Sequence, residues 1–230
     1  SGTTAAFGNM IAKKELNTLK ESMKAESEAT RMYYRLLCIK ANDKAYIRHT
    51  SDSLILPVLH YYTEKKDEHH LPEAYYYAGR VYRDLEDAPL ALDYFQKAID
   101  ALPDNKGYRL KSKIYSQMGT LFLYQKTYDE ALKILKEARK CNIALKDSAS
   151  MVFNLRDIAN GYRCLDQNDS SLYYLRKAYY IAKVLRNYDL MAMVQSQMAS
   201  LYIELEKYDL ARKFLQPSLD SLDIPSRSGI

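Results

Sequence analysis

Small and large apolar residues recur through residues 72–105 with the spacing of two amphipathic helices. The first set falls at positions i, i+3, i+4 and i+7 and the second at i, i+4 and i+7, so each set lies on one face of its helix. The two sets are Tyr75, Ala78, Gly79 and Tyr82, followed by Ala91, Phe95 and Ala98. Pro89 suits the first turn of the second helix, and Pro103 would end that helix. The segment is therefore predicted to be a helical hairpin whose small residues let the two backbones approach closely.

The same pattern returns at intervals of 40 residues. The small residue of the first helix recurs as Gly79, Gly119, Ala159 and Ala199. Each of these small residues is followed, after an offset of three residues, by an aromatic residue. The aromatic residues are Tyr82, Phe122, Tyr162 and Tyr202. A small residue of the second helix recurs as Ala91, Ala131, Ser171 and Ala211. This self-similarity indicates a repeat architecture, in which each hairpin buries its apolar face against the next one.

The hairpin at 72–105 resembles the tetratricopeptide repeat (TPR). The eight signature positions that match are Tyr75, Ala78, Gly79, Tyr82, Ala91, Phe95, Ala98 and Pro103. A TPR has a period of about 34 residues, so the longer period here predicts longer helices or connections. Residues 139–146 and 181–188 are interpreted as extensions of second helices. The resemblance implies an all-α fold, a right-handed α-α superhelix (TPR solenoid) of about five helical hairpins.

The chain divides into seven predicted segments. Residues 1–24 are interpreted as a tag remnant and a short helix that carries Leu16, Leu19 and Met23 on one face, and 25–71 as a degenerate first hairpin. Four TPR-like repeats follow at 72–111, 112–151, 152–191 and 192–225, and residues 226–230 form a tail. In the first hairpin, helices are predicted at 27–41 and 51–65, with Ser51-Asp52-Ser53 as candidate N-cap residues. Because a repeat array needs a polar cap, we expect the natural protein to continue beyond Ile230, or another chain to cover this end.

The segment at 33–62 carries a second resemblance, in the sequence YYRLLCIKANDKAYIRHTSDSLILPVLHYY. It is similar to the N-terminal part of bacterial TPR proteins that are often exported or membrane-anchored and are sometimes joined to a signalling or DNA-binding part. This implies a location in the bacterial cell envelope, with an anchoring segment outside the present sequence. A cytoplasmic location is the alternative.

The resemblance to TPR proteins also implies a binding surface, because the first helices of the hairpins line a concave groove. The candidate partner-binding residues are Tyr76, Tyr77, Arg80, Arg83, Gln117, Tyr124, Arg156, Asn160, Arg163 and Gln197, with Thr120, Asp157, Ser196 and Ser200 beside them. Rigid aromatic rings and adaptable hydrogen-bonding groups are common at recognition sites. The four arginines would also attract an acidic segment through bidentate contacts. The alternative interpretation is that these are solvated helix faces.

One specific mode of TPR recognition is excluded by the sequence. Chaperone-binding TPR domains hold a terminal carboxylate with Lys and Asn at fixed groove positions. The matching positions here are Tyr76, Arg80, Gln117, Phe153 and Asp157, so that clamp is absent.

Composition and motifs argue against catalysis and against several classes of partner. The net charge of +5 is modest and the two signs alternate, so no nucleic acid is expected to bind this fragment. No apolar run approaches the roughly 20 residues that span a bilayer, so no membrane contact is expected from this fragment. The three cysteines are far apart, and the four histidines have no metal-ligand spacing. Without a glycine-rich phosphate loop or a GxSxG motif, we expect no cofactor, no metal and no enzymatic activity.

Three functions remain open at this level. The first is a scaffold that binds a protein or a peptide, and acidic segments of that partner are one option. The second is the ligand-sensing module of a larger bacterial signalling or transcription-regulatory protein. The third is a self-assembly module that forms a homodimer through its C-terminal repeat.

Overall fold

The computed structural model describes residues 10–11, 13–103 and 107–222, with side chains up to residue 215. All regular secondary structure in these residues is helical, so the predicted all-α class is confirmed. The chain forms two compact units, residues 1–110 and residues 111–230. Each unit is described separately below.

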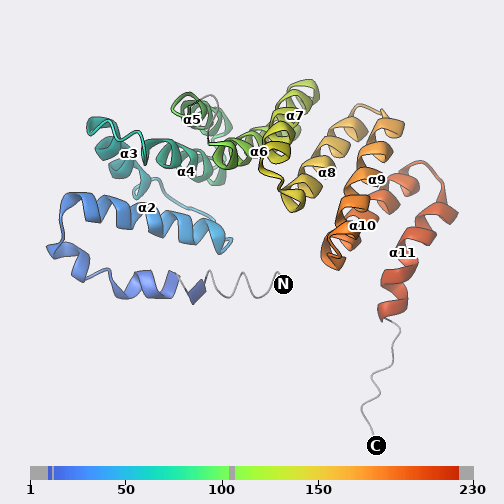
Figure 1. Ribbon diagram of the computed structural model, residues 1–230, viewed down its shortest axis with the longest axis horizontal. Coiled ribbons are helices and arrows are strands. Elements are labelled where there is room, and N and C mark those ends of the chain that lie inside the picture. The colour runs from blue at the N-terminus through green and yellow to red at the C-terminus, as the bar shows by residue number, and fades with distance from the viewer. Residues whose placement is uncertain (1–9, 12, 104–106, 223–230) are drawn as a thin grey trace, which may run out of the picture. The chain divides into compact units, whose positions relative to one another are not determined.

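The described part of unit 1 begins with helical residues 10–11 and 13–18 and continues through five named elements. These are η1 (Ser22–Ala25), α2 (Glu28–Lys44), α3 (Ile55–Glu64), α4 (Leu71–Asp84) and α5 (Ala88–Asp100). Helices α4 and α5 form the hairpin predicted at 72–105 (Figure 1). Helix α4 also contacts α2 and α3, so the first helix of this hairpin is covered by the preceding pair.

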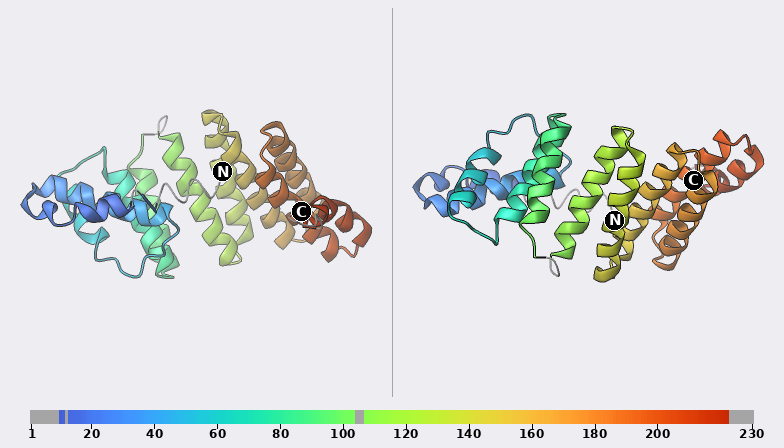
Figure 2. Two further views of the ribbon diagram at one scale, coloured as in Figure 1. Left: turned by 90° about the horizontal axis from the view of Figure 1, so that it is seen from below. Right: turned by 90° about the horizontal axis from the view of Figure 1, so that it is seen from above.

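Unit 2 is a series of helices of similar length. It contains α6 (Tyr108–Tyr124) from Lys111 onward. The helices that follow are α7 (Tyr128–Leu145), α8 (Ser148–Cys164), α9 (Asn168–Val184), α10 (Tyr188–Glu204) and α11 (Tyr208–Leu222). Each helix from α7 to α11 contacts the next, and α8 also contacts α10 (Figure 2). One apolar cluster runs through α8, α9, α10 and α11, and it includes Leu155, Leu175 and Met198.

The two glycines among the repeating small residues lie where paired helices cross, as predicted. A Cβ atom added to Gly79 would lie 2.5 Å from the ring of Phe95, and one added to Gly119 would lie 2.5 Å from Leu135. In both hairpins the crossing partner follows 16 positions after the glycine. The glycines are therefore needed because the partner side chain occupies the place of their Cβ atom.

The repeating aromatic residues of the first helices stack on a ring of the second helix. The stacked pairs are Tyr82 with Tyr94 at 5.3 Å between ring centroids, Tyr162 with Tyr174 at 5.4 Å, and Tyr202 with Phe214 at 5.6 Å. In each pair the second ring follows the first by 12 positions, so the stack recurs at equivalent positions of three repeats. In the fourth repeat the position 12 after Phe122 is Ile134, which has no ring. Stacked aromatic pairs contribute about 0.5–1.5 kcal/mol beyond the area that they bury.

The 40-residue period is made of two similar 20-residue parts. Helices α6, α8, α9 and α10 each have 17 residues, and a short turn follows each one. After these helices, and after α2, α3, α4 and α7, one non-glycine residue adopts a positive φ. In chain order the eight residues are Tyr46, Lys66, Glu86, Lys126, Lys146, Asp166, Arg186 and Glu206. The next N–H bonds back to the helix, as from Thr127 to the Phe122 carbonyl at 3.0 Å. This is the Schellman arrangement, which satisfies the last carbonyls of a helix. The longer helices explain the longer period.

Several local predictions need correction. Helix α3 starts at Ile55 after Leu54, and Ser51-Asp52-Ser53 does not cap it through a side chain, because Ser51 Oγ accepts from the Ser53 N–H instead. Helix α9 ends at Val184, so the extension predicted at 181–188 stops there and the chain turns into α10. The extension at 139–146 is helical through Leu145.

The N-terminal segment can be assessed only in part. Among the described residues, 10–11 and 13–18 are helical as predicted, and the Tyr34 hydroxyl of α2 donates to the Leu16 carbonyl at 2.9 Å. The predicted tail at 226–230 lies outside the described residues. The predicted repeat boundaries stay a prediction.

Candidate functional site

A cavity of about 370 Å³ lies among three first helices of unit 2, and we call it the α6–α8–α10 groove. Its lining residues are Thr120, Leu123 and Tyr124 of α6, Arg156, Asp157, Asn160 and Arg163 of α8, and Gln197 of α10. Five of the ten candidate residues therefore line one cavity. Leu123 is the lining residue that the sequence analysis missed.

The repeat brings these side chains together. Thr120 and Asn160 are 40 positions apart, as are Leu123 and Arg163, and Asp157 and Gln197. Equivalent positions of successive first helices therefore line the same cavity. The register that carries the small residues to the helix crossings also carries this polar set to the groove.

Arg156 and Asp157 form an ion pair in the groove. Arg156 Nη2 lies 2.7 Å from Asp157 Oδ1, and the Arg156 guanidinium also lies over the Phe153 ring at 5.4 Å. Burial raises the pKa of the Asp157 carboxyl, and the Arg156 charge offsets part of this effect. The pair supplies little net charge to the groove.

Arg163 links α8 to α10 and orients an amide. Its Nη1 donates to Glu204 Oε1 at 2.7 Å, and its Nη2 donates to Asn160 Oδ1 at 2.9 Å. Because Asn160 Oδ1 accepts this bond, its amide nitrogen keeps two donors for other partners. Neither that nitrogen nor the Gln197 amide bonds to another of the described side chains or main-chain groups. These amides are the hydrogen-bonding groups that the groove offers, and Tyr124 adds an exposed ring.

In unit 1 the structure does not place the candidate tyrosines on an open surface. Tyr76 and Tyr77 are 4% and 3% exposed, so the prediction that their rings line a groove is wrong. The two rings meet at 5.0 Å, and Tyr76 lies 5.9 Å from Phe95. The physical reason is that α2 covers α4, where Arg80 pairs with Asp43 at 2.5 Å.

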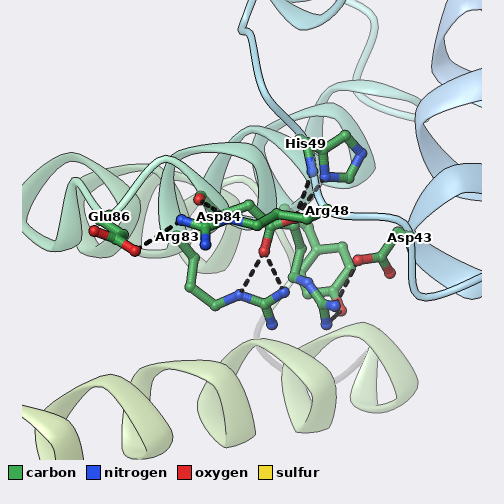
Figure 3. Close-up of polar contacts among 8 residues, drawn as sticks. Asp43, Arg48, His49, Arg83, Asp84 and Glu86 are labelled. Atoms are coloured by element: carbon green, nitrogen blue, oxygen red, sulfur yellow. Dashed lines mark hydrogen bonds and ion pairs between the residues drawn. The ribbon is translucent and has the colours of Figure 1, made fainter.

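Arg83 belongs to a polar cluster that ties the α2–α3 connection to the end of α4. Figure 3 shows Arg48 and His49 lying against Asp84, with Arg83 on the other side of that carboxylate. Arg48 Nε donates to the Asp84 main-chain oxygen at 2.7 Å, and His49 Nδ1 lies 2.8 Å from Asp84 Oδ2. Burial alone would raise the pKa of the Asp84 carboxyl, but hydrogen bonds from Arg83 and His49 outweigh it and lower that pKa. Arg80 thus links α4 to α2, and Arg83 holds the Asp84 carboxylate to which His49 bonds.

The remaining candidate residue is Gln117. It lies half-buried on α6 and is not among the residues that line the groove. Among the residues that the structure describes, no group of three or more His, Cys, Asp or Glu side chains is placed to hold a metal ion. The same residues contain no helix long and apolar enough to cross a membrane.

Comparisons with known proteins identify the fold. No family model matches the sequence, and no curated protein matches it. Solved structures do match. A signal transduction ATPase with numerous domains and a TPR sensor, from Pyrococcus horikoshii, has a TM-score of 0.75 and 18% identity over 90% of this chain and 33% of that chain. The present chain thus spans about a third of that protein.

Two other structures match over most of both chains. BtubC from P. vanneervenii has a TM-score of 0.70 and 14% identity, and covers 100% of this chain and 97% of that chain. A kinesin light chain with nearly identical TPR-like repeats, from Podosopora anserina, has a TM-score of 0.71 and 14% identity over 88% and 100%. Identities this low show shared architecture and not shared activity. Together with the repeating crossings, they show that this chain has the helical-repeat fold of TPR proteins.

Proposed function

We propose that this chain is a non-catalytic scaffold that holds a segment of another protein in the α6–α8–α10 groove. The observation that supports the proposal is that the Asn160 amide nitrogen and the Gln197 amide, which have no partner among the described residues, line one cavity beside the exposed Tyr124 ring. Side-chain amides donate and accept, so they match the N–H and C=O groups of an extended peptide. The similar solved structures support this role only through their shared helical-repeat fold, because a fold does not determine a function.

The charges of the groove argue for recognition of the main chain of the partner rather than of its acidic side chains. Arg156 pairs with Asp157, and Arg163 pairs with Glu204. An acidic segment would have to compete with these carboxylates, so its attraction to the two guanidinium groups is weakened. The preference for acidic segments that the arginines suggested stays a prediction for this groove.

The groove is tested by peptide selection followed by substitution. A random-peptide display library is selected on the immobilised chain, and the affinity of the recovered peptides is measured by fluorescence anisotropy. Replacing both Asn160 and Gln197 by Ala removes two hydrogen-bonding groups, each worth about 0.5–1.5 kcal/mol, so Kd should rise by about tenfold. Gln167→Ala removes an exposed amide that does not line the groove, and it should leave Kd unchanged. Equal affinities for all three proteins would reject the groove as the binding site.

A sensor role is the second candidate. The similar P. horikoshii protein is described as having a TPR sensor within a larger signal transduction ATPase. If the present chain has such a role, its full reading frame will encode an output domain, and a peptide held in the groove will change the activity of that domain. A full reading frame without an output domain would reject this candidate.

Self-assembly through the C-terminal repeat also stays a proposal. Met198 is buried in the apolar cluster of unit 2, so a charge there would disrupt folding before it tested assembly. Leu215 is half-buried and is the better position. If α11 mediates a dimer, Leu215→Asp will convert the dimer to a monomer in light scattering while the helical content is kept.

A further inference from the structure

A second and larger cavity lies in unit 2, among α7, α8 and α9, and we call it the α7–α9 cleft. Its volume is about 500 Å³, within the range of about 300–1,000 Å³ that is usual for ligand sites. Its lining residues are Arg139 of α7, Met151 and Leu155 of α8, and Tyr173, Arg176, Lys177, Tyr180 and Ile181 of α9. None of these residues lines the α6–α8–α10 groove, so the two cavities present different side chains.

The floor of the cleft is apolar. Leu155 belongs to the buried core, and Met151 and Ile181 are partly buried hydrophobic residues that pack against it. Tyr173 and Tyr180 are 52% and 68% exposed, although both are large aromatic residues. They are seven positions apart on α9, so both rings lie on the same face of that helix. Exposed rings beside an apolar floor are typical of a surface that another molecule covers.

The rim of the cleft is cationic and lacks compensating acids. Arg139, Arg176 and Lys177 line it, and no Asp or Glu does. Neither arginine has a carboxylate within ion-pair distance in the described part of the chain, whereas both groove arginines are paired. Lys177 Nζ lies 4.3 Å from the centroid of the Tyr173 ring, which holds the ammonium group at the rim. The cleft therefore carries three positive charges beside an apolar floor.

We propose that the α7–α9 cleft docks an acidic segment of a partner protein that inserts one bulky apolar side chain. The apolar side chain would cover Met151, Leu155 and Ile181, and flanking Asp or Glu residues would pair with Arg139 and Arg176. Guanidinium groups bind carboxylates in a bidentate manner, which fixes the register of such a segment. An apolar floor is covered by an apolar side chain, which a protein segment supplies and a sugar-phosphate backbone does not, so it favours a protein partner over a nucleic acid. This site is additional to the groove and does not depend on it.

The experiment uses a defined probe and the full chain. The probe is a short fluorescein-labelled peptide rich in Glu and Asp with a central Phe-Leu pair. One control peptide has Ser in place of Phe-Leu, and the other has Gln in place of every acid. Binding is followed by fluorescence anisotropy at low and high salt. Only the first peptide should bind well, and its affinity should fall as salt rises.

Two pairs of matched variants locate the binding. Arg139→Glu with Arg176→Glu reverses the rim charge and should raise Kd by about tenfold or more, because like charges then face the acids. Arg212→Glu reverses an exposed charge on α11 and should leave Kd close to that of the unmodified chain. Tyr180→Ser should weaken binding, whereas Tyr188→Ser, an exposed tyrosine outside the cleft, should not. Circular dichroism checks that each variant is folded.

Several outcomes would overturn the proposal. They are no binding of the acidic Phe-Leu peptide, equal binding of the Ser control, or an equal effect of Arg212→Glu and the rim variant. Single-stranded DNA that binds more tightly than the peptide and is released by the rim variant would show a nucleic-acid surface instead. A dimer in light scattering that the rim variant dissociates would show that a second copy of the chain covers the cleft.

Discussion

The crossing of α6 and α7 provides the sharpest test of the fold. Gly119→Ala would place a Cβ atom 2.5 Å from both Cδ2 and Cγ of Leu135, whereas carbon atoms in contact are about 3.5–4.0 Å apart. Leu135 is fully buried, so relief of about 1 Å requires a shift of the helices or of the Leu135 rotamer. Such overpacking costs about 1–3 kcal/mol, whereas alanine is favoured over glycine inside a helix by about 1 kcal/mol. The net result should be a loss of up to about 2 kcal/mol.

The same substitution should have the opposite sign when Leu135 is truncated. Leu135→Ala alone should cost about 2–5 kcal/mol through the cavity that it leaves. In that background the close contact with the Leu135 side chain is removed, so Gly119→Ala should regain about 1 kcal/mol from helix propensity. The coupling energy of the two changes is then about 1–3 kcal/mol, measured by urea unfolding of all four proteins with circular dichroism. Unfolding slopes that agree among the four proteins are required for the comparison.

The result that refutes this reasoning is simple to state. If Gly119→Ala stabilises the chain equally in both backgrounds, the helices do not approach closely at this position, and the small residue has another cause. Gly161→Ala is the matched control, because its Cβ atom would meet the Leu132 side chain at 2.9 Å rather than 2.5 Å. It should be tolerated better than Gly119→Ala. Gly119→Leu adds three further carbon atoms at the same place and should unfold the hairpin.

Three further predictions follow from local geometry. Lys126 has a φ of 62°, so Lys126→Gly should raise the free energy of unfolding by about 0.5–1 kcal/mol, while Lys133→Gly inside α7 should lower it by about 1 kcal/mol. Because the folded pKa of Asp84 is lowered, its stabilisation is present above about pH 4 and is lost as the pH falls through that lowered pKa. Thermal melts against pH should therefore show Asp84→Asn destabilised at neutral pH and converging with the unmodified chain in acid. Asn154 Nδ2 donates to the Leu135 carbonyl at 2.9 Å in the core, so Asn154→Ala should cost about 1–3 kcal/mol in urea unfolding.

The sequence was sufficient for the architecture because the architecture depends on contacts that repeat. Gly79 and Gly119 face residues 16 positions later, and Tyr82 and Tyr162 face rings 12 positions later. Such contacts lie within one hairpin, so their spacing is visible in the sequence itself. The groove of unit 2 was predictable for the same reason, because its residues are equivalent positions of successive repeats.

The errors in unit 1 come from an element that does not repeat. Tyr76 and Tyr77 occupy positions that would face outward in a regular array. Helix α2 lies more than 30 positions earlier in the chain, and its Asp43 reaches Arg80 of α4. The repeat pattern therefore does not predict that α2 packs over α4. The sequence does show a bulky Tyr-Tyr-Tyr run in α4, which suits a helix buried on several sides better than one with an open face.

The turns were also missed, because glycine is the usual signal for a left-handed residue and these turns do not use it. Lys126, Lys146 and Arg186 adopt positive φ values after the ends of α6, α7 and α9. A positive φ is energetically unfavourable for a residue with a side chain. The Schellman hydrogen bonds of the turn offset part of this energy. The regular spacing of these residues becomes visible only when the dihedral angles are known.

The two cavities of unit 2 differ in how their positive charges are compensated, and this difference predicts how each would bind. In the α6–α8–α10 groove, Arg156 and Arg163 already have carboxylate partners, so binding there depends on hydrogen bonds and should change little with salt. In the α7–α9 cleft, Arg139 and Arg176 have no such partner among the described residues, so binding there should weaken steeply as salt rises. First helices supply most of the groove, while α9 and α7 supply the rim of the cleft. If both proposals hold, the successive repeats of unit 2 would bind two partner segments of different chemistry, because their two sets of helices expose different side chains.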